Sequence, residues 1–302
     1  MIFREARTNF LVHCNSALTL SPHTYRAYEG DLIEAEQFLG YRKQIHRVSK
    51  ENLRSYIYFL RGVRALKEAT IKRKIASLKL LFRWIGEEGH LQENPFSTLN
   101  ERIRLPKRLP RGLDRADSVR LKNALSTVST RDDFDSLVSK TAIHLLLETG
   151  IRVGELVTIK LDDLSLTSGH IYIHGKGNRQ RLVYLLQKPL SRGLEKYIVL
   201  RNRLDCSSTH LFVNSLTKPM TAPHIRKALK IVGQAAAIDN RVTPHMLRHT
   251  CATQWLEDGL DIRYVQKLLG HHSISTTEIY THVSDQGLRE ALLRANGRRN
   301  DN

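Results

Sequence analysis

One pair of segments in this chain alternates apolar and polar residues, whereas its apolar residues elsewhere recur every three or four positions. The pair is IYI at 171–173 and RLVYL at 181–185, with GKGN between them. Such alternation is typical of strands with one buried face, and a glycine-rich turn between two of them indicates an antiparallel hairpin. Spacing of three and four predicts helices. The sequence therefore predicts a mainly α fold with one small antiparallel β-sheet.

Helix signals are clear in the first ninety residues. Ser21 is a candidate N-cap, Pro22 suits a first turn, and Gly40 ends that segment. Its apolar stripe consists of Tyr25, Tyr28, Leu32, Ala35 and Leu39. A later helix has an inward stripe of Ile71, Ile75, Leu78, Phe82 and Ile85. Cations project from the other sides of that helix, namely Lys72, Lys79 and Arg83. We expect this helix to bury its apolar stripe in the core and to present its cations at the surface.

Length and a proline-rich segment predict two domains. The chain has 302 residues, and a single domain usually has roughly 100–200. Between Asn94 and Leu113 there are three prolines and five cations, Arg102, Arg104, Lys107, Arg108 and Arg111. We therefore expect a helical domain over residues 1–100, a basic linker over 101–113, and a second, mostly helical domain over 114–302.

The charge balance points to a polyanionic partner. Forty-eight Lys and Arg against thirty Asp and Glu leave a net charge of +18, more than solubility requires. No run approaches the ~18 apolar residues of a membrane span, and MIFREARTNF lacks the apolar stretch of a signal peptide. We expect a cytoplasmic protein that binds nucleic acid and no membrane. Its three widely spaced cysteines favour neither disulfides nor zinc.

Three helix starts near the C-terminus place polar side chains. Thr243 is a candidate cap followed by Pro244, so His245 and Arg248 share a face of a helix that stops before Gly259. A short helix should run from Asp261 to Gly270, with Ile262, Val265, Leu268 and Leu269 inward. The S-x-x-E pattern of Ser275 and Glu278 predicts another start, with Tyr280 in its first two turns.

Four segments together carry a specific pattern. They are TGIRVGEL with Arg152, HGKGNRQRLVYL with Lys176, TPHMLRHT with His245 and Arg248, and LGHHSISTTEIY with His271 and Tyr280. Each is weak alone, but their order and spacing resemble the tyrosine recombinase (phage integrase) family, particularly Xer-like recombinases and integrases of small mobile elements. SPHTYRAYEGDL resembles the family's N-terminal core-binding domain. Two departures, Tyr184 and His272, leave the six-residue set intact.

The resemblance implies a nucleophile and two phosphate-binding arginines. Tyr280 would attack the phosphodiester and form a 3′-phosphotyrosyl link, leaving a free 5′-hydroxyl. Arg152 and Arg248 would each fork two N–H donors onto the phosphate oxygens, in a planar geometry that lysine does not reproduce. Because the covalent bond is stored in the intermediate, no ATP, metal or other cofactor is expected.

The resemblance also assigns the proton transfers. Lys176, in the hairpin turn, would protonate the leaving 5′-oxygen as general acid, His245 would accept the tyrosine proton, and His271 would donate a hydrogen bond to a phosphate oxygen. Glu155 lies one turn beyond Arg152. It either orients that guanidinium or forms an ordinary surface i,i+3 pair.

The implied assembly is a two-domain clamp on double-stranded DNA. Two clamps would occupy short inverted half-sites, and two sites would pair in a homotetramer, or with a related recombinase, to exchange strands through a Holliday junction. The tail face of Leu288, Leu292 and Leu293 either contacts a neighbouring protomer or packs locally. The sequence favours a mobile-element, plasmid or transposon recombinase, with Xer-type chromosome-dimer resolution as the alternative.

Three other interpretations are weaker. His245 and His249 lie four apart, as in a zinc motif, but Met246 occupies the base position and Arg248 would place a cation beside the metal. A catalytically inactive DNA-binding accessory protein disagrees with the intact six-residue set. A topoisomerase with related chemistry fits the Xer-like spacing less well.

Overall fold

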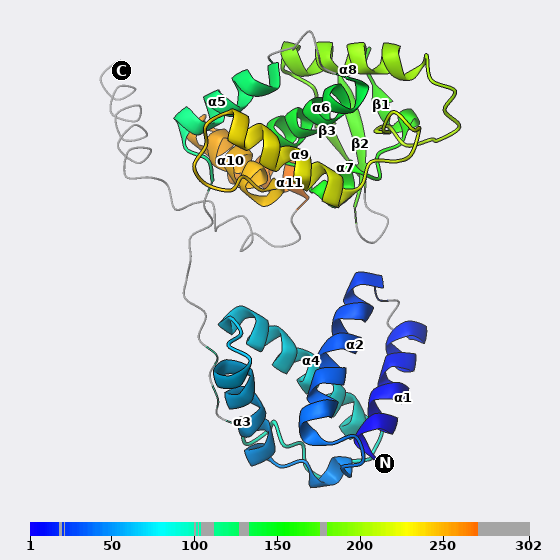
Figure 1. Cartoon of the computed structure of the whole chain (residues 1–302), viewed down its shortest axis with the longest axis vertical. Coiled ribbons are helices and arrows are strands. Elements are labelled where there is room, and N and C mark those ends of the chain that lie inside the picture. Colours follow the sequence, from blue (N-terminus) through cyan, green and yellow to red (C-terminus); the bar gives the residue numbers. More distant parts are fainter. Residues whose placement is uncertain are drawn as a thin grey trace, which may run out of the picture. The chain divides into compact units, whose positions relative to one another are not determined.

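The computed structural model describes residues 1–17, 20, 22–99, 101, 103, 112–126, 133–175 and 180–270. The chain forms two compact units, Met1–Arg108 and Leu109–Asn302 (Figure 1). None of the helices in these described ranges is both long and apolar enough to span a bilayer. The expected fold class, mainly helical with one small antiparallel sheet, is confirmed.

The first unit is entirely helical in its described part. Its helices are α1 (Phe3–Ser16), α2 (Pro22–Leu39), the 3₁₀ turn η1 (Ile45–Arg47), α3 (Lys50–Tyr58), the π-helical turn η2 (Phe59–Val63) and α4 (Glu68–Glu87). The predicted stripe of α4 is inward: Ile71, Leu78, Phe82 and Ile85 are fully buried, and Ile75 packs against the same core. Lys72, Lys79 and Arg83 are exposed, as expected.

A buried acidic residue ties α2 to α4 within this unit. Asp31 is 3% exposed and accepts hydrogen bonds from Lys74 Nζ at 3.0 Å and Ser77 Oγ at 2.9 Å, and from Arg73. A buried carboxylate is tolerated when its charge and lone pairs are matched in this way. Part of the basic character of α4 is therefore used inside the unit.

The second unit surrounds one central helix. Its helices are α5 (Arg115–Ser126), α6 (Phe134–Thr149), α7 (Val153–Leu156), the 3₁₀ turn η3 (Leu161–Asp163), α8 (Lys188–Arg201), α9 (Ala222–Ala235), α10 (Pro244–Glu257) and α11 (Ile262–Leu269). The seven residues from Thr141 to Leu147 on α6 are all buried. Consecutive buried positions occupy every side of a helix. Accordingly, α6 contacts α5, α7, α8, α9 and α10.

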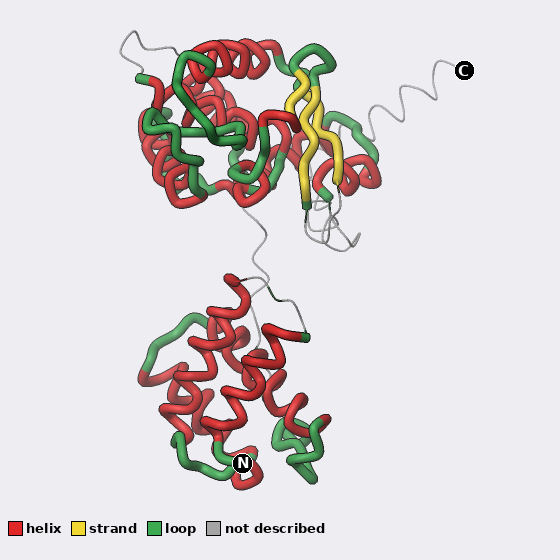
Figure 2. Tube along the Cα trace, turned by 90° about the vertical axis from the view of Figure 1, so that its right-hand side faces the viewer, coloured by secondary structure: helices red, strands yellow, loops and turns green. Residues whose placement is uncertain are grey.

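A three-stranded sheet lies at one edge of this unit (Figure 2). Its order is β1 (Leu164–Ser165), β2 (His170–His174) and β3 (Gln180–Tyr184), all antiparallel. Ile171 pairs with Val183, and both are buried, so the hairpin has one buried face, as the alternation predicts. The sequence prediction missed β1 because two residues are too short to show a period.

The helix boundaries near the C-terminus agree with the capping signals. Thr243 Oγ1 accepts from the Met246 amide and begins α10, and Asp261 accepts from the Arg263 amide and begins α11. Gly270 ends α11 with φ of 67°, in the left-handed region that glycine adopts without strain. Val265 and Leu269 are buried as predicted, whereas Ile262 and Leu268 are half-buried.

All three cysteines are free thiols, and Cys14 and Cys251 are buried. Burial raises the pKa of both of these thiols. A thiol with a raised pKa is a poor nucleophile, so these two side chains act as small apolar residues in the core.

Candidate active site

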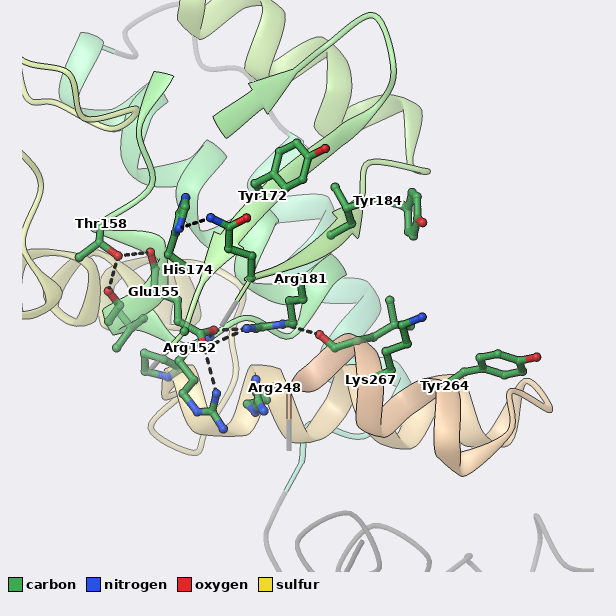
Figure 3. Close-up of a pocket in the computed structure, with 18 of the residues that line it drawn as sticks. Arg152, Glu155, Thr158, Tyr172, His174, Arg181, Tyr184, Arg248, Tyr264 and Lys267 are labelled. Carbon is green, nitrogen blue, oxygen red and sulfur yellow. Dashed lines mark hydrogen bonds and ion pairs between the residues drawn. The ribbon is translucent and has the colours of Figure 1, made fainter. Parts of the chain in front are cut away.

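A cavity of about 1530 Å³ opens on the second unit between the hairpin and the two C-terminal described helices. It is lined by α7, by β2 and β3, by the start of α10 and by α11 (Figure 3). Three residues proposed from the sequence, Arg152, His245 and Arg248, all line it. The fold thus brings segments distant in sequence to one place.

Arg152 is presented to the cavity by a sharp turn. Gly150 ends α6 in the left-handed conformation with φ of 62°, and Arg152 then becomes the N-cap of α7. Its side chain is 44% exposed and donates from Nη1 to Glu155 Oε1 at 2.9 Å. The guanidinium is therefore held at one end and open to the cavity at the other.

Glu155 is the buried partner of that guanidinium. Its side chain is only 9% exposed, and besides Arg152 Nη1 its carboxylate accepts the Arg152 backbone amide at 2.8 Å. Burial alone would raise the pKa of this carboxyl, but hydrogen bonds from Arg181 and Arg152 outweigh it and lower the pKa. Of the two roles open from the sequence, the structure shows the orienting one, since a surface pair would be exposed.

Arg248 is more buried, and makes more hydrogen bonds within the protein, than the sequence suggested. It is 4% exposed, with Nη1 donating to the Gly150 carbonyl at 2.7 Å and Nη2 to the Leu269 carbonyl at 2.8 Å. We expected both arginines to offer a free two-pronged fork. Each terminal nitrogen of Arg248 donates one N–H to a backbone carbonyl, so the protein itself already engages both of them.

His245 lies in the first turn of α10, is exposed, and lines the cavity together with Arg248. The other three predicted residues, Lys176, His271 and Tyr280, lie outside the described residues, as do Leu288, Leu292 and Leu293 of the tail. In the sequence, Lys176 falls between β2 and β3, and His271 follows Gly270, the C-cap of α11.

The cavity also contains residues outside the predicted six-residue set, among them Tyr184, which the sequence analysis had noted only as a departure from the family pattern. Arg181 on β3 forms a two-pronged ion pair with Glu155. His174 Nε2 lies 2.8 Å from Asp163 Oδ1, and the exposed Tyr172 and Tyr184 line the cavity from the hairpin. One signal could have revealed Arg181. It falls in phase with Val183 and Leu185, on the apolar face of its strand.

A zinc site at His245 and His249 would need at least one further protein ligand nearby. In the described part of the chain, no group of three His, Cys, Asp or Glu side chains is arranged to hold a metal ion. His249, the second histidine of the motif, lies next to Gly112, where a β-carbon on that glycine would be 3.0 Å from Cδ2 of the histidine ring.

Comparison with known protein families identifies both units. Residues 8–89 match the model described as "Phage integrase, N-terminal SAM-like domain", and residues 113–287 match the "Phage integrase family". The second match alone covers more than half of the chain. The tyrosine recombinase architecture combines an N-terminal helical unit with a second, mostly helical unit that contains this arginine-lined cavity. The chain belongs to the phage integrase family.

Whole-length relatives agree. Tyrosine recombinase XerC of Thermodesulfovibrio yellowstonii is 33% identical over 292 residues, covering 94% of this chain and 93% of the relative. XerC of Staphylococcus carnosus is 34% identical over 301 residues, covering 97% and 98%. The reaction class expected from the sequence, tyrosine-type site-specific DNA recombination, is confirmed by these relatives.

Solved structures share the fold. XerH recombinase bound to its palindromic difH substrate matches with a TM-score of 0.78 and 22% identity, covering 95% of this chain and 84% of that one. The Tn1549 transposon integrase bound to transposon right-end DNA matches with a TM-score of 0.71 and 20% identity, covering 97% and 99%. At these identities the likeness concerns the fold.

Proposed function

We propose that this recombinase cuts DNA with Tyr280 and stores the phosphodiester as a 3′-phosphotyrosyl bond. The phenolic oxygen bonds to phosphorus while the bond from phosphorus to the 5′-oxygen breaks. The tyrosine proton passes to His245, and Lys176 protonates the departing 5′-oxygen. Attack by a 5′-hydroxyl of a partner strand reverses these steps, so the number of phosphodiester bonds is unchanged.

The observation that carries this proposal is the convergence of Arg152 and Arg248 on one cavity. Arginine pairs suit a five-coordinate phosphorus because they offset negative charge that grows on the non-bridging oxygens. Arg152 is open to the cavity, and Arg248 is fixed by two carbonyls so that little reorganisation is needed. His271 completes this set as a further hydrogen-bond donor to phosphate.

We further propose the domain roles and the assembly. Residues 1–100 form the core-binding domain, 101–113 a basic linker and 114–302 the catalytic domain, which together clamp double-stranded DNA in the cytoplasm, on the nucleoid. Two copies occupy inverted half-sites, and paired sites hold a homotetramer. The net charge of +18 supports this partner. Several solved relatives of similar fold are recombinases on DNA, including a lambda integrase tetramer bound to a Holliday junction.

Two biological roles follow from different observations. A mobile-element role is our first proposal, and the transposon integrase among the structural neighbours is compatible with it. Chromosome-dimer resolution is the second, and it is favoured by whole-length relatives named XerC. Cleavage of DNA from the ends of the neighbouring element, compared with cleavage of candidate chromosomal dimer-resolution sites, separates the two roles.

The reaction itself is tested with nicked suicide duplexes in EDTA. Wild type, Tyr280→Phe and Tyr264→Phe are incubated with candidate sites, and products are separated on a denaturing gel. Tyr264 is the matched control because it is an exposed tyrosine that lines the same cavity. We expect a covalent protein–DNA band with wild type and Tyr264→Phe and none with Tyr280→Phe. A band with Tyr280→Phe would assign the nucleophile elsewhere, and no band on DNA that the protein binds would favour an inactive accessory protein.

A further inference from the structure

Arg181 is a buried cation at the back of the candidate active site. It comes from β3, on the strand face that also carries Val183, and its side chain is 12% exposed. Burying a guanidinium is costly unless an anion and hydrogen bonds compensate for the lost water. The side chain must therefore be explained by what it contacts.

Among the described residues, Arg181 donates hydrogen bonds to two elements, α7 and α11. Nη1 and Nη2 donate to Glu155 Oε1 and Oε2 at 3.1 and 2.7 Å, and Nε donates to the carbonyl of Leu268 at 2.8 Å (Figure 3). A β-carbon on Gly270 would lie 3.1 Å from Nη1, so the end of α11 closes over the guanidinium. Held on these sides, Arg181 is not placed to bind phosphate.

Glu155 in turn joins Arg181 to Arg152. The same carboxylate accepts the backbone amide and Nη1 of Arg152, at 2.8 and 2.9 Å. The three side chains form one line from the hairpin to the cavity, with Glu155 in the middle and Arg152 at the open end.

The charges of these groups explain why Glu155 needs both Arg181 and Arg152 as partners. With Arg181 present, the two guanidinium groups and the one carboxylate carry a net charge of +1, and Arg152 presents that charge to the cavity. Without Arg181, a buried carboxylate would be left with Arg152 as its single cation among these contacts, and it would draw further N–H donors of that guanidinium onto itself. The carboxylate would then compete with DNA for Arg152.

We propose that Arg181 is a positioning residue that keeps Arg152 available to the scissile phosphate by neutralising Glu155. The inference rests on the proposed function in one respect, namely that Arg152 binds that phosphate. Arg181 contacts neither DNA nor Tyr280 in this role. Its effect reaches the reaction only through Glu155 and Arg152.

The test measures single-turnover formation of the covalent complex, DNA affinity and thermal unfolding for Arg181→Gln. The matched control is Arg192→Gln, an exposed arginine on α8 in the same unit. We expect Arg181→Gln to slow cleavage by about 10- to 100-fold, by analogy with the loss of a hydrogen-bonding residue behind a metal ligand. Affinity for DNA should change less than about threefold, because most of it comes from other phosphate contacts.

Two combinations separate positioning from general damage. In an Arg152→Lys background, Arg181→Gln should cost less than about threefold, since residues acting through one group are not additive. Adding Glu155→Gln to Arg181→Gln should raise the cleavage rate by at least about threefold over the single variant, because the uncompensated carboxylate is gone. The double variant also removes the buried charge that would otherwise hinder folding of the single variant.

The outcomes are distinguishable. A wild-type cleavage rate for Arg181→Gln overturns the proposal, as does an equal loss in the wild-type and Arg152→Lys backgrounds or a failure of Glu155→Gln to recover rate. If Arg152→Lys itself cleaves as fast as wild type, the proposed role of Arg152 fails instead. Loss of rate with recovery and non-additivity supports the assignment.

Discussion

The Nη1 group of Arg248 donates a 2.7 Å hydrogen bond to the carbonyl of Gly150, so a candidate phosphate ligand also holds the end of α6. Gly150 is the turn that leads to Arg152, the other candidate arginine. This hydrogen bond therefore links Arg248 to the turn that carries Arg152, and so helps to set the distance between the two guanidinium groups. The same guanidinium reaches Leu269 at the end of α11, which makes three elements depend on it.

Arg248→Lys should lower both stability and activity. An ammonium group cannot reach both carbonyls in the planar geometry of a guanidinium, and hydrogen bonds to charged groups contribute about 1.5–3 kcal/mol each. We expect the free energy of unfolding of the second unit to fall by about 2 kcal/mol and cleavage to slow by about 10²- to 10³-fold. Urea unfolding followed by Trp255 fluorescence in a Trp84→Phe background reports on this unit, because the chain has two tryptophans.

The exposed Arg226→Lys on α9 is the control for that measurement. It should leave both the unfolding midpoint and the cleavage rate unchanged. An Arg248→Lys protein as stable as the control would contradict the structural role, and one that cleaves as fast would contradict the catalytic role.

Gly150→Ala should destabilise the second unit strongly. The backbone there has φ of 62°, and a β-carbon would lie 2.8 Å from Leu269 Cδ2. Left-handed backbone and overpacking together cost about 2 kcal/mol. The comparison is Gly193→Ala, within α8, where the nearest atom is Thr141 Oγ1 at 3.7 Å. That change should raise stability by up to about 1 kcal/mol. Equal unfolding midpoints for the two variants would show that the Leu269 side chain does not pack closely against residue 150.

His144 should make stability depend on pH in the mildly acidic range. Burial lowers its pKa below the ordinary 6.5; nearby Glu148 raises it and Lys122 lowers it, and the net direction is down. Below pH 6.5 the unfolded chain therefore binds a proton that the folded chain resists. This contribution is complete above pH 6.5 and is lost as pH falls toward the folded pKa.

His144→Gln should flatten the slope of unfolding free energy against pH below pH 6.5, whatever its effect on stability at neutral pH. Urea melts across that range test this, with the exposed His224→Gln on α9 as control. A variant slope equal to that of wild type would assign the acid sensitivity to another group.

Lys79→Gln should change how DNA binding responds to salt. Lys79 is exposed on α4, and removing one contact between a cation and a phosphate reduces the slope of log affinity against log salt by about 0.9. Binding is measured on duplex DNA at several salt concentrations. Lys79→Arg keeps the charge and should keep the slope. If Lys79→Gln has the wild-type slope, this face of α4 does not contact the backbone.

Much of the fold was predictable because its signals are local. The capping of α10 by Thr243 and of α11 by Asp261, and the inward stripe of α4, depend on neighbours within a few residues. Strand β1 was missed because two residues have no period, and Asp31 was missed because its partners lie on another helix.

The sequence indicated three of the residues that line the candidate cavity, but little of how they are arranged there. Resemblance pointed to Arg152, His245 and Arg248, and all three line one cavity. It could not indicate that Arg248 is bound to two backbone carbonyls. Nor could it show that Glu155 lies between two arginines, because one of those partners is distant in sequence.

The sequence by itself determined the helical class, the hairpin, the positive charge and the six residues whose order indicates the reaction. Composition and periodicity along the chain set the first three of these properties, and the resemblance to the tyrosine recombinase family indicated the six residues. Only the tertiary structure decided which arginine is open, which is held, and that Arg181 stands behind Glu155. The reason is physical: burial and neighbouring charge determine what a guanidinium can bind, and both arise only when separate elements pack together.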